Sequence, residues 1–133
     1  ESDSSSYSLA LRLTENYHNE LLGDLIPAVE GTYSTYAEDT TAEGIRVSRD
    51  HRAFCGFSMG SVATWRTFQY CLDDFRYVLP SSGSLTADVE DGTFRYANNE
   101  KEGNLYFLEQ EGGTHNGDYA MEYFYNGLCW IWQ

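Results

Sequence analysis

The segment Gly56-Phe57-Ser58-Met59-Gly60 has the residue types and the spacing of a nucleophilic serine turn. A serine hydroxyl is a poor nucleophile at neutral pH, so it needs a nearby base, an accessible position and donors for the developing oxyanion. A sharp turn between a strand and a helix exposes the serine, and its crowded backbone favours small residues two positions before and two after it. The pattern predicts Ser58 as the nucleophile and the Met59 backbone N–H as an oxyanion donor.

His115 is the expected general base, because serine hydrolases of the α/β type carry their residues in the chain order Ser, acid, His. It follows the last expected strand and stands in a Gly-rich loop before the final helix. His51 and His18 precede Ser58 and do not fit this order, so we interpret His51 as structural and His18 as solvent-facing. The alternatives are a loop or capping role for His115 and a plain Gly/Ser helix-start turn for Ser58.

The acid that should orient the base is not fixed by the pattern. Asp91, with Asp88 as the alternative, lies in the expected loop after the second strand and before His115. Each is equally a common turn or surface residue. The pair at residues 73 and 74 falls at the end of the nucleophile helix, which is the wrong place.

Aromatic residues make up 16% of the chain, with 11 Tyr among them. Such residues suit core packing and also a cleft for a phenol or a sugar. Trp65 lies two turns along the expected nucleophile helix, so we expect it in the core. Asn116 and Tyr119, beside His115, are the better candidates for a substrate-binding rim.

Helical and strand patterns alternate around these residues. Apolar residues at three- and four-residue steps predict helices with one buried face: residues 9–33, 59–75 and 118–132, the last with Asp118 as candidate N-cap. Short apolar runs are typical of buried strands: residues 51–57, 75–80 and 104–109. The class is therefore α/β, with a parallel sheet and flanking helices. Residues 32–41 are expected to form a loop.

Composition restricts the domain count and the partners. The chain has 133 residues, which fits one domain, and 41% of them are hydrophobic, which excludes a disordered composition. The net charge of −13 repels phosphates and anionic lipids, so nucleic acid and membranes are not expected partners. The acidic, Ser-rich residues 1–8 are predicted to be a linker remnant or a processed terminus, and residues 9–133 a single domain.

The cysteines Cys55, Cys71 and Cys129 lack the spacing of metal ligands, so no metal is expected. One interpretation is a single disulfide with one free thiol, and Cys55–Cys129 is then the preferred pair. The alternative is three buried thiols that pack as small hydrophobes. Acyl transfer through a serine requires no cofactor, and none is expected.

Four runs closely resemble feruloyl esterase domains, the xylanase-associated carbohydrate esterases of rumen bacteria and anaerobic gut fungi: residues 25–38, 51–65, 70–83 and 103–132. The resemblance covers most of the chain from about Tyr17 onward. It implies an α/β-hydrolase fold with Ser58 as nucleophile and His115 as base. It also implies a secreted esterase that hydrolyses the bond between ferulate and arabinose, with feruloylated arabinoxylan as its partner.

The chain departs from that family in two places. The strands before Tyr17, which would carry the second oxyanion donor, are absent. Only residues 84–93 separate Gly83 from Phe94, where the family has a helix and a strand that ends in the catalytic Asp. We therefore interpret the chain as a partial or gapped esterase domain. The alternatives are a deletion variant and completion by a second chain.

Two other functions remain open at this stage. An acetyl xylan esterase or a general carboxylesterase would use the same Ser and His. A catalytically impaired, carbohydrate-associated domain would lack the acid of the triad, although loss of one triad member leaves residual catalysis. The oligomeric state is not predicted by any feature of the sequence.

Overall fold

A computed structural model describes residues 7–83, 108 and 110–132. The elements follow one another in the order α1 (Tyr7–Glu15), α2 (Tyr17–Glu20), the π-helical turn η1 (Leu21–Leu25), α3 (Ile26–Thr32), α4 (Ala42–Val47), the 3₁₀ turn η2 (Arg49–His51), β1 (Ala53–Phe57), α5 (Met59–Tyr70), β2 (Tyr77–Ser81) and α6 (Gly117–Ile131). No helix among these residues is long and apolar enough to cross a membrane.

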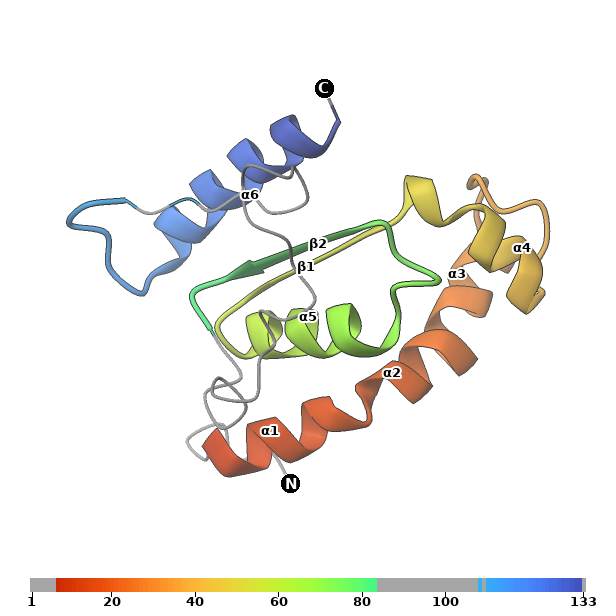
Figure 1. Cartoon of the computed structure of the whole chain (residues 1–133), viewed down its shortest axis with the longest axis horizontal. Helices are drawn as coiled ribbons and strands as arrows, with labels where there is room; N and C mark the ends of the chain where they lie inside the picture. Colours follow the sequence, from red (N-terminus) through yellow and green to blue (C-terminus); the bar gives the residue numbers. More distant parts are fainter. Residues whose placement is uncertain (1–6, 84–107, 109, 133) are drawn as a thin grey trace.

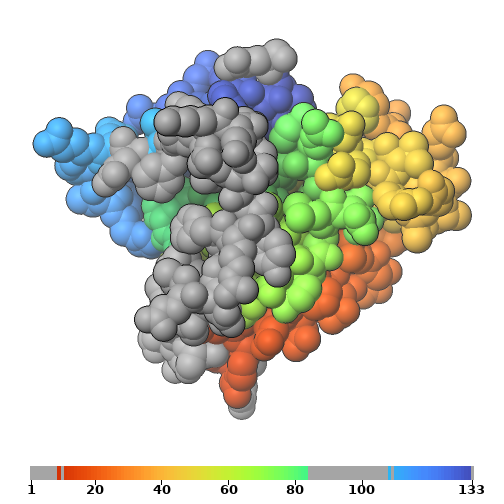
Figure 2. Space-filling model, viewed as in Figure 1, coloured from red at the N-terminus to blue at the C-terminus, as the bar shows by residue number. Residues whose placement is uncertain are grey.

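Strands β1 and β2 pair in parallel, with Cys55 opposite Leu79. Helix α5 covers one face of the pair and α6 covers the other, while α1 and α2 pack on the outside of α5 (Figure 1). Figure 2 shows α6 in blue at the upper edge of the surface and α1 in red at the lower edge. The predicted α/β class with parallel strands and flanking helices is confirmed. Most of the third predicted strand, residues 104–109, lies outside the described residues.

A glycine brings α6 close to the sheet. A Cβ on Gly127 would lie 2.0 Å from Cδ1 of Leu79, the central residue of β2. A side chain at position 127 would therefore require either the Leu79 side chain or the helix to move. Because His115 precedes α6 by one residue only, this contact also bears on where His115 lies.

The apolar core lies toward the amino ends of the two strands. It is formed by buried residues from η1, α3, α4 and the segment before β2: Leu21, Ile26, Ile45, Cys71 and Phe75. Phe54 of β1 packs edge-on against Phe75, with ring centroids 5.8 Å apart. The predicted helical pattern over 9–33 is confirmed as a chain of short helices, and Pro27 is tolerated because it stands in the first turn of α3.

A nearly buried ion pair closes the same end of the molecule. The side chains of Arg52 and Glu30 are 12% and 11% exposed, and Arg52 Nε donates to Glu30 Oε1 at 3.0 Å. The same guanidinium donates to the carbonyls of Ile45 and Asp74 at 3.0 and 2.6 Å, and to Ser48 Oγ at 2.9 Å. Arg52 therefore joins α3, α4 and the segment before β2 at the start of β1.

The protonation of Glu30 follows from these contacts. Burial works to raise its pKa, but hydrogen bonds with Thr35 and Arg52, together with the positive charge of Arg52, hold the pKa below its ordinary value. The carboxylate form is thus favoured in the folded protein.

Two expectations about the elements were wrong, and one short helix had no prediction. Helix α5 ends at Tyr70 instead of residue 75, because a turn follows in which the N–H groups of Asp74 and Phe75 both donate to the Cys71 carbonyl. Helix α6 starts at Gly117, so Asp118 is not its N-cap. The short helix α4 was not predicted; the Thr41 side chain caps it by accepting from the Gly44 N–H at 3.1 Å.

The cysteines correct both earlier interpretations. All three thiols are free, so Cys55 and Cys129 do not form the disulfide considered above. Cys55 and Cys129 are exposed, and only Cys71 packs as a buried hydrophobe. Burial, together with the charge of Asp74, raises the pKa of Cys71 to about 11, so this thiol stays protonated at neutral pH.

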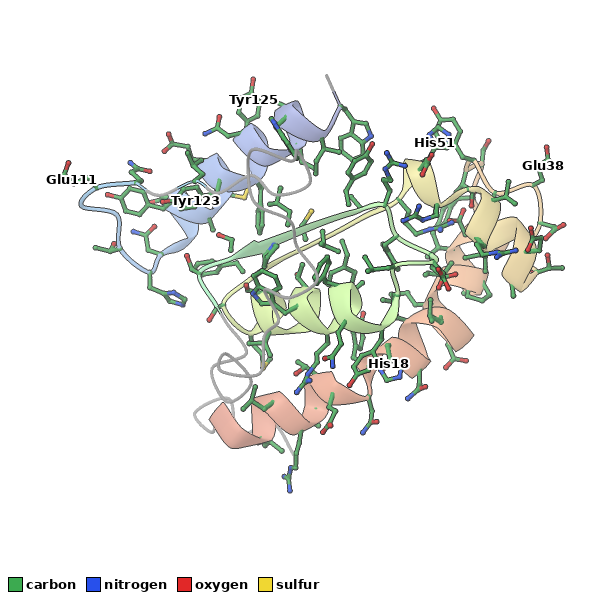
Figure 3. The ribbon with its side chains drawn as sticks, viewed as in Figure 1. His18, Glu38, His51, Glu111, Tyr123 and Tyr125 are labelled. Atoms are coloured by element: carbon green, nitrogen blue, oxygen red, sulfur yellow. The ribbon has the colours of Figure 1, made fainter. Side chains whose placement is uncertain are left out.

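The two histidines outside the predicted site lie on the N-terminal helical part (Figure 3). The exposed His51 ring stacks on Tyr36, with centroids 3.8 Å apart. His18 is half-buried rather than fully solvent-facing, because its ring packs on Tyr70 with centroids 4.5 Å apart.

Candidate active site

Ser58 lies in the sharp turn between β1 and α5, with φ 58° and ψ −115°. A non-glycine residue in this left-handed region costs about 1–3 kcal/mol and persists only where its surroundings hold it. The Ser58 N–H donates to the Ser81 carbonyl at 3.0 Å, and the Ser58 carbonyl accepts from the Ser61 N–H at 3.0 Å. The side chain is half-buried, at the carboxyl end of β1.

The two glycines that flank Ser58 have different roles. A Cβ on Gly56 would lie 2.0 Å from the Gly60 carbonyl oxygen, so position 56 requires glycine. A Cβ on Gly60 would meet no atom within 4 Å among the described residues. The crowding that the motif predicts is therefore real at Gly56, whereas Gly60 contributes the backbone that approaches it.

His115 reaches the turn from the loop before α6, which lies near the carboxyl ends of the strands in Figure 1. Its Nε2 lies 3.0 Å from Ser58 Oγ, within hydrogen-bond distance. The ring also stacks on Phe57, with centroids 4.6 Å apart and an interplanar angle of 26°. The structure thus brings together the predicted nucleophile and base, which stand 57 residues apart in the chain.

Met59 is the first residue of α5, so its backbone N–H has no acceptor within the helix. The positive end of the helix dipole points toward the same position. This arrangement can hold an oxyanion beside Ser58, as the motif predicts.

No carboxylate among the described residues hydrogen-bonds or pairs with the His115 ring. Asp91 and Asp88, the two predicted acids, lie outside those residues. Within the described part of the chain, Phe57 is the side chain that packs on the ring. The sequence analysis missed this contact, because Phe57 occupies a motif position that accepts many residue types.

The expected substrate rim is brought beside the base. The Asn116 side-chain oxygen accepts from the Asp118 and Tyr119 N–H groups at 2.8 and 3.4 Å, so Asn116 is the N-cap of α6. Tyr119 is half-buried in the first turn of α6. Asp118, three residues after His115, is exposed. The described residues contain no cluster of His, Cys, Asp or Glu able to hold a metal ion.

A serine held in a left-handed strand–helix turn with an imidazole on its hydroxyl, at the carboxyl ends of parallel strands, defines an α/β-hydrolase-like protein. Comparison with solved structures narrows this class. One structure of a protein named FAE has a TM-score of 0.70 and 30% identity. A mutant of the feruloyl esterase module from Clostridium thermocellum, complexed with sinapinate, has a TM-score of 0.71 and 28% identity.

Both matches cover 86% of this chain and 57% of the solved chain. In sequence, 69 residues are 51% identical to endo-1,4-beta-xylanase Y of Acetivibrio thermocellus, which is 52% of this chain and 6% of the xylanase. No family model matches the chain. The resemblance to feruloyl esterase modules is thus confirmed in sequence and in fold, over a chain that spans about half the length of the solved modules.

Proposed function

We propose that this protein is a serine esterase that hydrolyses feruloyl and related hydroxycinnamoyl esters on arabinoxylan. The observation that carries the proposal is the 3.0 Å approach of His115 Nε2 to the hydroxyl of Ser58 in its strained turn. The similarity to a feruloyl esterase module bound to sinapinate, a hydroxycinnamate, supports the acyl group. The match to a xylanase supports a polysaccharide of the plant cell wall as partner, and an extracellular location.

The geometry supports a two-step acyl transfer. Ser58 Oγ attacks the ester carbonyl carbon while His115 Nε2 accepts the hydroxyl proton. The resulting oxyanion is stabilised by the Met59 N–H at the start of α5. His115 then gives its proton to the sugar hydroxyl, which leaves, and the acyl group remains on Ser58. Water, deprotonated by the same His115, attacks the acyl-enzyme and releases the hydroxycinnamate.

Two further groups complete the proposal. Asp91, with Asp88 as the alternative, acts as the acid that holds the His115 ring and stabilises its charged form. Asn116 and Tyr119 contact the substrate beside the base, because Asn116 is the N-cap of α6, directly after His115, and Tyr119 lies in the first turn of that helix. Neither a metal nor a cofactor takes part in these steps.

The test is turnover of methyl ferulate by matched pairs of variants. We expect Ser58→Ala to lose about 10⁴-fold or more of kcat, and His115→Ala to lose a comparable factor. Ser34→Ala and His51→Ala are the controls, because both residues are exposed and precede the amino end of β1, whereas Ser58 follows its carboxyl end. Unchanged turnover in Ser58→Ala would contradict the proposed nucleophile.

A second measurement separates the proposal from its rivals. A serine-directed phosphonate should add one mass increment to the protein, located on Ser58 by peptide mapping. Acetyl and feruloyl esters of the same alcohol then distinguish a feruloyl esterase from a general carboxylesterase. An inert chain that resists the phosphonate would instead support the impaired domain, the rival function that lacks the acid of the triad.

A further inference from the structure

One backbone carbonyl beside the serine turn receives two side-chain donors. Ser61 Oγ donates to the Gly83 carbonyl at 2.8 Å, and Trp65 Nε1 donates to the same oxygen at 3.0 Å. The two donors stand four residues apart on α5 and therefore share one face of that helix. Ser61 is fully buried and Trp65 is half-buried, so both bonds are partly shielded from water.

The accepting segment touches Ser58 directly. A Cβ on Gly83 would lie 2.3 Å from the Ser58 carbonyl oxygen and 2.9 Å from Ser61 Cβ. Two residues earlier, the Ser81 carbonyl accepts from the Ser58 N–H at 3.0 Å. Residues 81–83 thus contact both the N–H and the carbonyl side of the Ser58 peptide groups.

This contact joins two strained residues. Ser58 has φ 58°, and Ser82, in the segment that presses on it, has φ 55°. Left-handed backbone at non-glycine residues persists when neighbouring structure over-determines it. The hydrogen bonds from Ser61 and Trp65 supply such a restraint. They fix Gly83, which lies two residues after the end of β2, to helix α5.

We propose that Ser61 and Trp65 are positioning residues that clamp Gly83 onto α5 and so hold the Ser58 hydroxyl in line with His115. This inference rests on the proposed esterase function for its catalytic consequence. It extends the functional motif from the five residues of the serine turn to Trp65, seven residues after the nucleophile. Neither side chain touches the reacting atoms, so each acts through the backbone of residues 81–83.

The closing experiment uses Ser61→Ala, Trp65→Phe and the double variant, each of which removes a donor and keeps most of the packing. We expect each single variant to lower kcat on methyl ferulate about fivefold, the effect of one ordinary hydrogen bond, and the double variant to lower it about 25-fold or more. KM should stay within about twofold, because ground-state binding is not touched. The rate of phosphonate labelling at Ser58 should fall in parallel with kcat.

Thr67→Val is the matched control. Thr67 is also buried on α5, but its hydroxyl donates within the helix, to the Ala63 carbonyl at 3.0 Å. This variant loses a buried hydroxyl without loosening Gly83, so kcat should stay at the wild-type value even if stability falls. A kcat loss in Thr67→Val equal to that in Ser61→Ala would overturn the clamp.

Hydrogen exchange separates failure of the clamp from failure of the proposed function. The Ser58 amide should exchange about tenfold faster in the double variant, whereas the Cys55 amide in the middle of β1 should not change. Gly83→Ala should act in the same direction by pushing the segment off Ser58. An unchanged exchange rate of the Ser58 amide in the double variant would overturn the clamp, whether or not the protein is an active esterase. A wild-type chain inert to both ester and phosphonate would contradict the esterase function, and with it the catalytic part of the inference.

Discussion

The amino ends of β1 and β2 are held by a buried ion pair and an apolar cluster, whereas their carboxyl ends are held by hydrogen bonds around strained backbone. At the first end, Arg52 binds Glu30 and three further acceptors, next to the cluster around Phe75. At the second end, Ser58 and Ser82 both have positive φ, and His115 approaches on an exposed loop.

The residues that stabilise the fold and the residues expected to carry the chemistry thus lie at opposite ends of two strands of five residues each. Ligands of open α/β sheets bind at the carboxyl ends of the strands, where loops can be shaped without disturbing the core. Strain at that end must be compensated elsewhere in the fold. A substitution should therefore affect mainly folding at one end and mainly turnover at the other.

The largest effect is expected for Arg52→Met. Loss of the guanidinium leaves the Glu30 carboxylate buried without its partner, which should lower the free energy of unfolding by about 3–5 kcal/mol. Urea denaturation measures this value. Arg76→Met is the control, because Arg76 pairs with Asp50 at 3.2 Å on the surface, and its loss should cost below about 1 kcal/mol. Equal losses in the two variants would remove the distinction between the ends.

The next largest effect is expected for Gly56→Ala. The new Cβ cannot coexist with the Gly60 carbonyl, so the turn must shift and carry Ser58 Oγ away from His115. A displacement of about 1 Å lowers kcat about 100-fold. Gly60→Ala, which meets no described atom, should retain kcat within a small factor. The comparison fails if Gly60→Ala is as damaging as Gly56→Ala.

A smaller effect is expected from two phenylalanines at opposite ends of β1. Phe57→Leu removes the ring that packs on His115 and should lower kcat about tenfold with little change in stability. Phe54→Leu should do the reverse, because Phe54 packs on Phe75 in the core. Measurements of kcat and of the urea midpoint on both variants provide the check. A loss of stability without loss of kcat in Phe57→Leu, or the reverse in Phe54→Leu, would contradict the prediction.

The smallest effect is expected from pH, and it concerns the amino end alone. Because the folded pKa of Glu30 lies below its ordinary value of 4.5, the group contributes stability above that value and loses it as pH falls through the folded pKa. Asp74 has the opposite sign, since burial and the nearby Asp73 charge raise its pKa. Urea midpoints from about pH 6 to about pH 3 should therefore fall more in the wild type than in Glu30→Gln.

The carboxyl end was largely predictable from sequence because its signals are local. Five consecutive residues fix the strand–turn–helix crossing, and the position of His115 follows from chain order. The predicted strand over 51–57 and the start of the helix at residue 59 are confirmed as β1 and α5. The spacing of Gly56 and Gly60 around Ser58 reflects the close approach of the Gly60 carbonyl to Gly56.

The features that were missed depend on contacts between distant segments. Trp65 reads as a core residue because periodicity places it on the buried face of a helix, and only the fold shows that its N–H reaches Gly83. Arg52 carries no signal of burial in the sequence, since its five hydrogen bonds go to four acceptor atoms in three other segments. Asp and Asn are both favoured N-cap residues, so the sequence alone does not distinguish Asp118 from Asn116. In the structure Asn116 is the cap.

The close seat of α6 on β2 has a consequence for the distance between base and nucleophile. Gly127 packs over Leu79. It lies about 15 Å along the helix axis from Gly117, the first residue of α6, since each of the ten residues rises about 1.5 Å. Helix α6 is also held next to its far end, where Trp132 packs edge-on against Tyr77 of β2 with ring centroids 6.2 Å apart, and His115 lies two residues before its first residue. Sliding of the helix along the sheet by one turn, about 5.4 Å, would separate His115 Nε2 from Ser58 Oγ by several ångströms, so the close contact of Gly127 with Leu79 helps to hold the distance between these two atoms.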